Sequence, residues 1–502
     1  MKTRYIIGLI TLMFSASSCT KLDENLNGQI GNSGISSNNV TGLVAASYAS
    51  MVGPYQGPYN WQALQQVTSD ETIVPTRGGD WDDNGAWRAL FLHRWAPDHA
   101  RISDVFRDLN SITYVTTNAL GYNPSASQAA QLRFLRAFAQ FSILDGWGKV
   151  PYRVFGEDLT QPSNVRSTSE AITFLTTELT AIIPNLPDGP ANVANKNAAR
   201  TLLMKLYLNK GVFLNRSTPT FDPADMANVI TLANQIGLSG YTLTANYFDN
   251  FAPANATLST ENIFTAQNTG GVAGSDIFSL YSTTLHYNQN PSGNNGFCTL
   301  SDMYNKFEAS DTRRGMSYTG QTNINGLRIG FLVGQQVNQN GVALKDRRGN
   351  NLAFTPEVSI IERDQNHLEV AGIRVVKYPI DIANLGSRQM ENDWVYFRYA
   401  DVLLMKAEAQ LRTSQNAEAL SVVNSIRTVR GASALTTLTL DILLDERARE
   451  LYWEGFRRQD LIRFGKFLQA RQEKAVDDPK YLLFPIPDNQ IANPNLPQNP
   501  GY

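Results

Sequence analysis

Apolar residues recur every three to four positions through much of the chain, a period that predicts amphipathic helices. Residues 98–120 place one such stripe at Ile102, Val105, Phe106, Leu109, Ile112 and Val115. Residues 129–144 place another at Leu132, Leu135, Phe138 and Phe141. We therefore expect long helices that each bury one face, in a fold that is mainly α.

A sequence similarity within the chain predicts two related helical hairpins. The segment LLMKLYLNKGVFL begins at Leu202 and LLMKAEAQLRTSQ at Leu403, and each leads through a polar loop into a second helix, near Ala224 and Ala417. Small alanines at helix contacts are typical of tetratricopeptide-like hairpins, although the spacing departs from their repeat of about 34 residues. Chance similarity between two amphipathic hairpins is the alternative, and both interpretations predict helices.

Residues 241–390 have a different character. Clusters of Gly, Asn and Ser alternate there with short β-prone runs such as GLRIGFLV and GIRVVKYPI. This pattern predicts a loop-rich, partly β layer inserted between two parts of a helical scaffold, residues 41–240 and 391–502. Binding sites are often carried by loops on a rigid scaffold, so we expect the ligand site in this layer.

The first residues predict export and lipid attachment. Lys2 and Arg4 precede an apolar run and the small residues up to Ser18, which together are typical of a signal peptide over residues 1–18. The following Cys19 resembles the acylated cysteine of a bacterial lipobox, and an ordinary secretory signal with a chance cysteine is the alternative. Residues 19–40 are polar, which predicts a flexible tether.

Composition narrows the functional classes. The 502 residues carry 43 Lys plus Arg against 45 Asp plus Glu, a net charge of −2 that disfavours nucleic acid as a partner. The second cysteine, Cys298, has no partner for a disulfide once Cys19 is acylated. The four histidines show no metal-binding spacing, so we expect neither a metal nor a cofactor.

The stretch TRGGDWDDNGAW, residues 76–87, contains the chemistry of a sugar site. Sugars need an aromatic platform and fixed polar groups, and a Gly pair allows the tight turn that presents them. Here the aromatic candidates are Trp81 and Trp87, with Trp87 equally suited to the core, and the polar ones are Arg77, Asp80, Asp83 and Asn84. Further ligand-binding candidates are Trp61, Tyr287, Asn288, Phe297 and Arg388.

Four segments in order resemble the SusD/RagB family of outer-membrane lipoproteins. They are residues 130–152, 392–411, 443–467 and 481–502, behind a lipobox-like signal. The resemblance implies a single SusD-like α-helical domain over residues 41–502. It also implies a surface lipoprotein of the outer membrane that captures oligosaccharide, or in some members peptide, for a SusC-like TonB-dependent transporter during polysaccharide utilization.

Two other functions are alternatives to glycan binding. A glycoside hydrolase would use two of Asp80, Asp82 and Asp83, but one loop does not place carboxyls on opposite sides of a bond, so we expect no catalytic activity. A transporter-associated scaffold without a ligand stays as the second alternative. Glu446, Glu450 and Glu454 stand among arginines at helical spacing, which favours a structural ion-pair network over an acid–base pair.

Overall fold

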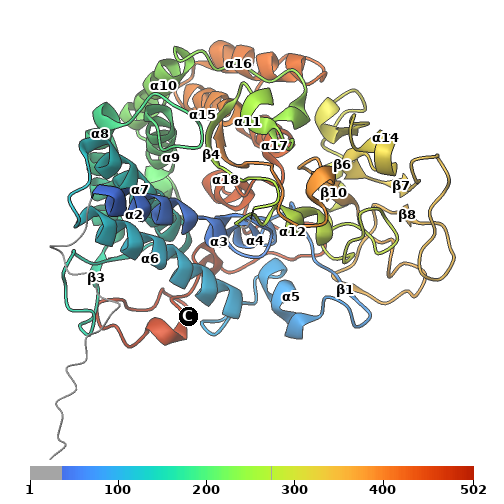
Figure 1. Ribbon diagram of the computed structural model, residues 1–502, viewed down its shortest axis with the longest axis horizontal. Coiled ribbons are helices and arrows are strands. Elements are labelled where there is room, and N and C mark those ends of the chain that lie inside the picture. The colour runs from blue at the N-terminus through green and yellow to red at the C-terminus, as the bar shows by residue number, and fades with distance from the viewer. Residues whose placement is uncertain (1–36, 273) are drawn as a thin grey trace, which may run out of the picture.

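The computed structural model describes residues 37–272 and 274–502 (Figure 1). The predicted signal peptide, the lipidation site Cys19 and the tether up to residue 36 lie outside these residues. Helix α2 (Ser37–Ala49) begins within the range expected to be tether, residues 19–40, so that expectation was wrong at its C-terminal end.

Long helices form most of the scaffold, at the left and top of Figure 1. They are α6 (Ala100–Leu120), α7 (Ala126–Trp147), α8 (Thr168–Ile182), α9 (Lys196–Leu214), α10 (Pro223–Gly237), α15 (Tyr399–Arg412), α16 (Asn416–Val429) and α17 (Leu440–Leu451). Each helix from α6 to α9 packs on the next one in this order, up to α10. Helix α10 also packs directly against α15, although the inserted layer separates the two helices in the sequence. The prediction of a mainly α fold is confirmed.

The two predicted amphipathic helices are α6 and α7. All the stripe residues are buried except Val115 of α6, which is half-buried. Ser125 and Gln128 form a capping box at the start of α7, and Gly148, with a left-handed φ of 73°, ends it. Helix α8 begins with a second capping box, formed by Ser167 and Glu170.

The two predicted hairpins are α9 with α10 and α15 with α16. Their second helices begin at Pro223 and Asn416, one residue before the expected alanines. Ala407 of α15 and Ala419 of α16 are fully buried in a small core with Val423 and Leu443. Small side chains at this contact let the two helices approach closely, as the sequence suggested.

Shorter helices occur in the scaffold and in the inserted layer. They are α3 (Val52–Tyr55), α4 (Trp61–Gln66), α5 (Ala86–Phe91), α11 (Asn255–Leu258), α12 (Ile277–Ser282), α13 (Ser301–Tyr304), α14 (Thr322–Asn325) and α18 (Arg457–Arg463). Within the described residues, no helix is both long enough and apolar enough to cross a membrane.

The strands form small sheets and are β1 (Thr76–Arg77), β2 (Val150–Tyr152), β3 (Asn164–Arg166), β4 (Asn262–Ala266), β5 (Gly315–Met316), β6 (Ile329–Leu332), β7 (Gly334–Gln335), β8 (Ala353–Phe354), β9 (Ile361–Glu362), β10 (Arg374–Val376) and β11 (Trp394–Arg398). Strand β1 pairs in parallel with β9, with Thr76 opposite Ile361. The other pairs are antiparallel: β2–β3, β4–β11, β7–β8 and the three-stranded β10–β6–β5. The β-prone runs of the sequence became β6 and β10.

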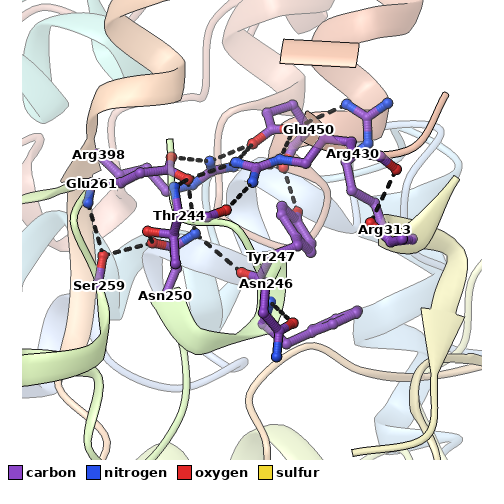
Figure 2. A network of polar contacts seen from close by, with 12 residues as sticks. Thr244, Asn246, Tyr247, Asn250, Ser259, Glu261, Arg313, Arg398, Arg430 and Glu450 are labelled. Carbon is purple, nitrogen blue, oxygen red and sulfur yellow. Dashed lines mark hydrogen bonds and ion pairs between the residues drawn. The ribbon is translucent and has the colours of Figure 1, made fainter. Parts of the chain in front are cut away.

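A buried ion-pair network joins the scaffold to the inserted layer (Figure 2). Glu450 of α17 accepts hydrogen bonds from Arg398 at 2.6 Å, from Arg430 at 2.9 Å and from Arg313 at 2.9 Å. Arg398 and Arg430 also bind Glu261, at 3.1 and 2.6 Å. These side chains are at most 1% exposed, so each charge depends on its partners for solvation.

The structural interpretation of Glu446, Glu450 and Glu454 is confirmed, with one correction to their partners. Among the described residues, only Glu446 binds an arginine from its own helix, Arg449 at 2.7 Å. Glu450 of α17, and Glu454 just after this helix, are neutralised from other segments, in particular by Arg398 of strand β11. Sequence spacing alone therefore identified the role of these carboxylates and missed most of the arginines.

Candidate functional site

The loop after β1 begins with a tight turn at the Gly pair that the sequence singled out. The Arg77 N–H donates to the Asp80 carbonyl at 2.9 Å, and the Asp80 N–H donates back to the Arg77 carbonyl at 3.1 Å. Gly78 between them has a φ of 65°, which glycine adopts without steric cost. Pairing of β1 with β9 fixes this turn against residues 361–362 of the inserted layer.

Three non-glycine residues beyond the turn hold left-handed backbone conformations. The φ angles are 61° for Trp81, 40° for Asp83 and 51° for Asn84. Each such residue costs about 1–3 kcal/mol, least for Asn and Asp and most for a bulky side chain such as Trp. Strain of this kind concentrates at functional sites, because only a surrounding structure that fixes the residue can maintain it.

Contacts from a second loop fix the indole of Trp81. Its Nε1–H donates to the Asn294 carbonyl at 2.7 Å, and its ring meets Phe297 edge-on, with 5.6 Å between centroids. Gly296 lies so close that a Cβ atom there would be 2.2 Å from the indole. Trp81 nevertheless stays half-buried, so part of the ring remains available to a ligand.

Polar groups gather at Asp80, the residue that precedes Trp81. The Tyr287 hydroxyl donates to Asp80 at 2.7 Å, and the Arg347 guanidinium lies 3.9 Å from the Tyr287 ring centroid and 3.7 Å from the Asp80 carboxylate. The exposed Asn288 donates from its side chain to the Lys345 carbonyl at 2.9 Å. We call Asp80, Trp81, Tyr287, Asn288 and Arg347 the platform.

Buried charges hold the platform arginine. Arg347 donates from Nε to Glu369 at 2.6 Å, and the opposite side of this carboxylate lies 2.8 Å from Nε2 of the buried His286. Burial opposes ionisation of Glu369, but hydrogen bonds from Arg347 and His286 outweigh it and lower the pKa of the carboxyl group. Burial, followed by the hydrogen bond to Asp80, raises the pKa of Tyr287 to about 12, so its hydroxyl stays a donor at neutral pH.

Three predicted ligand contacts lie beneath the platform and correct the sequence interpretation. Arg77, Trp87 and Phe297 are 4%, 1% and 1% exposed, so they support the site without contacting a ligand. Phe297 packs edge-on against Trp87, with 5.1 Å between centroids, as well as against Trp81. Arg77 donates to the Leu368 and Ala371 carbonyls at 3.0 and 2.8 Å, which ties the loop to the inserted layer.

Two other predicted residues lie elsewhere. Trp61 packs on Trp147, with 6.4 Å between centroids, beside a cavity of about 50 Å³ in the helical part. Arg388 is exposed and its guanidinium lies over the ring of Phe278. Within the described part of the chain these contacts place both residues apart from the platform, so a role for either in ligand binding stays a prediction.

The remaining acidic residues of the loop serve its structure. Asp83 accepts a hydrogen bond from the Trp87 indole at 2.5 Å, and Asp82 pairs with Arg88 at 2.5 Å. Asn84 is exposed next to them. No group of His, Cys, Asp or Glu residues in the described ranges is arranged to hold a metal ion.

Sequence reasoning missed Arg347 and Asn294. Arg347 belongs to the run KDRRGN, in which nothing distinguishes it from Arg348, and its role depends on Tyr287, 60 positions earlier in the sequence. Asn294 acts through its backbone carbonyl, which no side-chain pattern can reveal.

Comparison with known proteins identifies relatives along almost the whole chain. The sequence pattern of the SusD family matches residues 260–502. The starch-binding protein SusD of Bacteroides thetaiotaomicron is 25% identical, over 84% of this chain and 82% of its own length.

Solved structures share the fold. A laminarin-binding SusD-like protein superposes with a TM-score of 0.71 at 18% identity, covering 93% of this chain and 99% of that one. Surface glycan-binding protein A from Bacteroides thetaiotaomicron, solved with laminarihexaose, gives a TM-score of 0.68 at 18% identity, with 92% and 99% covered.

Proposed function

Because the chain belongs to the SusD/RagB family, we propose that it captures oligosaccharide at the cell surface and passes it to a SusC-like TonB-dependent transporter of the outer membrane. Its relatives are named as binding proteins, and the chain is a binding protein and not an enzyme. One relative is named for starch and a protein of the same fold was solved with the oligosaccharide laminarihexaose, and the platform supplies the chemistry that such a ligand needs.

The single observation that carries this proposal is the strained, fixed and partly exposed Trp81. A sugar offers an apolar CH face, which an indole contacts best when its orientation is set before binding. The left-handed backbone, the bond to Asn294 and the contact with Gly296 set that orientation. A core tryptophan would have no need of this strain, since ordinary burial would suffice.

The polar members of the platform complement the hydroxyl groups of a sugar. Asp80 offers carboxylate acceptors, Asn288 offers an amide, and Arg347 offers the donors of its guanidinium that Glu369 leaves free. Asp80 and Arg347 are about half exposed, at 52% and 51%, so both can bind ligand without leaving their present partners. Charged donors and acceptors at fixed spacing discriminate among sugar hydroxyl arrangements.

The cellular part of the proposal rests on the first residues of the sequence. A lipid-anchored Cys19 would hold the protein at the outer membrane, facing the cell exterior, through acyl chains alone. The proposed function involves no nucleic acid as a partner, and the net charge of −2 agrees with this.

Fractionation and titration test the proposal together. We expect the native protein to sediment with outer membranes, the Cys19→Ala variant to become soluble, and affinity purification to recover a TonB-dependent transporter. Calorimetric titration of the mature protein should show binding of neutral oligosaccharides and none of peptides of similar size. Peptide binding alone would favour the peptide-binding alternative, and no binding would favour the scaffold.

A further inference from the structure

Two consecutive arginines in the inserted layer have opposite surroundings. Arg313 is fully buried and binds three carboxylates, those of Asp311, Glu446 and Glu450, at 2.6–2.9 Å. Arg314, the next residue, is half-buried and forms no ion pair within the described chain. Its guanidinium lies 4.4 Å from the centroid of the Tyr304 ring and donates to the Tyr304 hydroxyl, which leaves donors of its fork unused.

A second arginine without a carboxylate partner among the described residues precedes strand β6. Arg328 is exposed and, within this part of the chain, donates only to the Ser317 hydroxyl at 3.3 Å and to the Gly315 carbonyl at 3.4 Å. These distances are long for hydrogen bonds donated by a charged group, which are usually about 2.7–2.9 Å. Most of the hydrogen-bonding capacity of Arg328 is therefore free.

Two facing glycines lie close to these arginines in the chain. Gly315 of β5 is directly opposite Gly330 of β6, and both have positive φ angles, 139° and 85°. A Cβ atom on Gly330 would lie 2.4 Å from the Gly315 Cα, so no side chain fits between the two strands. The glycines therefore let β5 and β6 approach closely, which fixes the segments that carry Arg314 and Arg328 next to each other.

Arg314, Gly315 and Arg328 line one cavity of about 280 Å³. Its lining contains Arg314, Arg328, Tyr304 and the amides Gln335 and Gln336, and no Asp or Glu. Another cavity, of about 220 Å³ beside α17 and α18, sets three aspartates, Asp70, Asp441 and Asp445, against four cationic side chains. In the cavity at Arg314 and Arg328, by contrast, no carboxylate in the lining offsets either arginine.

We propose that this cavity is a second ligand site, which binds the carboxylate or sulfate-ester group of an acidic oligosaccharide. A guanidinium fork binds such oxyanions with two parallel hydrogen bonds, and Arg314 is already oriented by Tyr304. Gln335 and Gln336 of the same cavity supply amides for the hydroxyls of the adjoining sugar ring. The choice of a saccharide as carrier of the anion rests on the proposed function, whereas the anion selectivity rests on the arginines alone.

Calorimetric titration of the mature protein tests this site with four probes: tetragalacturonate, a sulfated tetrasaccharide of the carrageenan type, neutral maltotetraose and inorganic sulfate. We expect one or both acidic tetrasaccharides to bind and to lose about tenfold in affinity for each arginine replaced, in Arg314→Gln and Arg328→Gln. Added NaCl should weaken this binding. The exposed Arg363, which lies outside the cavity, provides the matched control Arg363→Gln, with unchanged affinity.

Each other outcome decides against the site. Acidic tetrasaccharides that fail to bind, or that bind the Arg314→Gln and Arg328→Gln variants as well as the wild type, would overturn the proposal. Inorganic sulfate that binds as tightly as the tetrasaccharides would overturn the assignment to a saccharide. Because Arg328 is exposed, its replacement tests the site even if Arg314→Gln disturbs folding. Failure of the platform is separate, since it would show as lost maltotetraose binding with acidic binding retained.

Discussion

Gly296 lies so close to Trp81 that a Cβ atom at position 296 would be 2.2 Å from the indole. The two residues come from loops more than 200 positions apart, and their contact, together with the bond from Trp81 to Asn294, determines how the indole is presented. The orientation of the platform is therefore a property of two loops, and a change in either one should alter binding.

A single methyl group at position 296 should displace the indole. We expect Gly296→Ala to weaken oligosaccharide binding by about tenfold or more. The added methyl group displaces Trp81 from its preset orientation, and the free energy needed to restore that orientation makes binding less favourable. Gly79→Ala is the matched control in the partner loop, since a Cβ atom at that position meets no atom within 4 Å. Calorimetric titration of both variants measures the effect, and equal affinities would contradict the role of this contact.

Replacement of Arg347 separates hydrogen bonding from stacking at the platform. Arg347→Gln removes the cation over the Tyr287 ring and the partner of Glu369, so we expect affinity to fall about three- to tenfold. Arg348→Gln, one position along the same exposed turn, should leave affinity unchanged, because Arg348 contacts Gln365 and no platform residue. A larger loss in Arg348→Gln than in Arg347→Gln would place the site elsewhere in this loop.

Acid should unfold the protein through its buried carboxylates. Despite burial, Arg313 and other arginines lower the pKa of Glu446 from 4.5 to about 2, and Asp401 and Glu408 likewise reach about 2. Between about pH 4.5 and about 2 the unfolded chain binds more protons than the folded one. The ionised carboxylates therefore contribute fully to the free energy of unfolding above about pH 4.5, and this contribution is lost as the pH falls to about 2. Calorimetric melting temperatures across this range should fall steeply, and a flat profile would contradict the ion-pair account.

Removing one charge from the network should be costly at neutral pH. Glu450→Gln leaves Arg398, Arg430 and Arg313 short of a carboxylate, and we expect a loss of about 3–5 kcal/mol in the free energy of unfolding. Glu418→Gln, at an exposed position of α16, should change it by less than about 0.5 kcal/mol. Urea denaturation of the two variants provides the comparison, and similar losses would mean that burial of the network contributes little.

Glu71 should produce the opposite pH dependence. Burial raises the pKa of Glu71 to about 8, so the folded chain binds an extra proton and stability falls as pH rises from about 4.5 towards 8. Glu71→Gln mimics the protonated form and should remove this part of the decline. Melting temperatures of wild type and variant that decline in parallel between pH 5 and about 8 would show that Glu71 is ionised in the fold.

The helical scaffold could be predicted because its information is local. The stripe containing Leu132 and Leu135, the boxes at Ser125 and Ser167, and the alanines of the hairpins each act within a few turns of one helix. The partners of Glu450 could not be predicted, since strand β11 brings Arg398 to α17 from 52 positions away.

The candidate site could be predicted only in part, for the same reason. The loop containing Asp80 and Trp81 combines glycines, acids and an indole in one short stretch, which distinguishes it in the sequence. Burial of Trp87 and Phe297, by contrast, depends on a mutual contact between distant segments. Contacts with Tyr287 and Glu369 position Arg347, and only the folded inserted layer brings these three residues together.

The central claim, that Trp81 forms the surface on which oligosaccharide docks, is tested most directly by calorimetric titration of Trp81→Ala with the neutral oligosaccharide that binds the wild type most tightly. Trp61→Phe, at the tryptophan that the structure places against Trp147, serves as the control. We expect Trp81→Ala to lose about 1–3 kcal/mol of binding free energy or all detectable binding, and Trp61→Phe to bind as the wild type does. Undiminished binding by a folded Trp81→Ala protein would contradict the account.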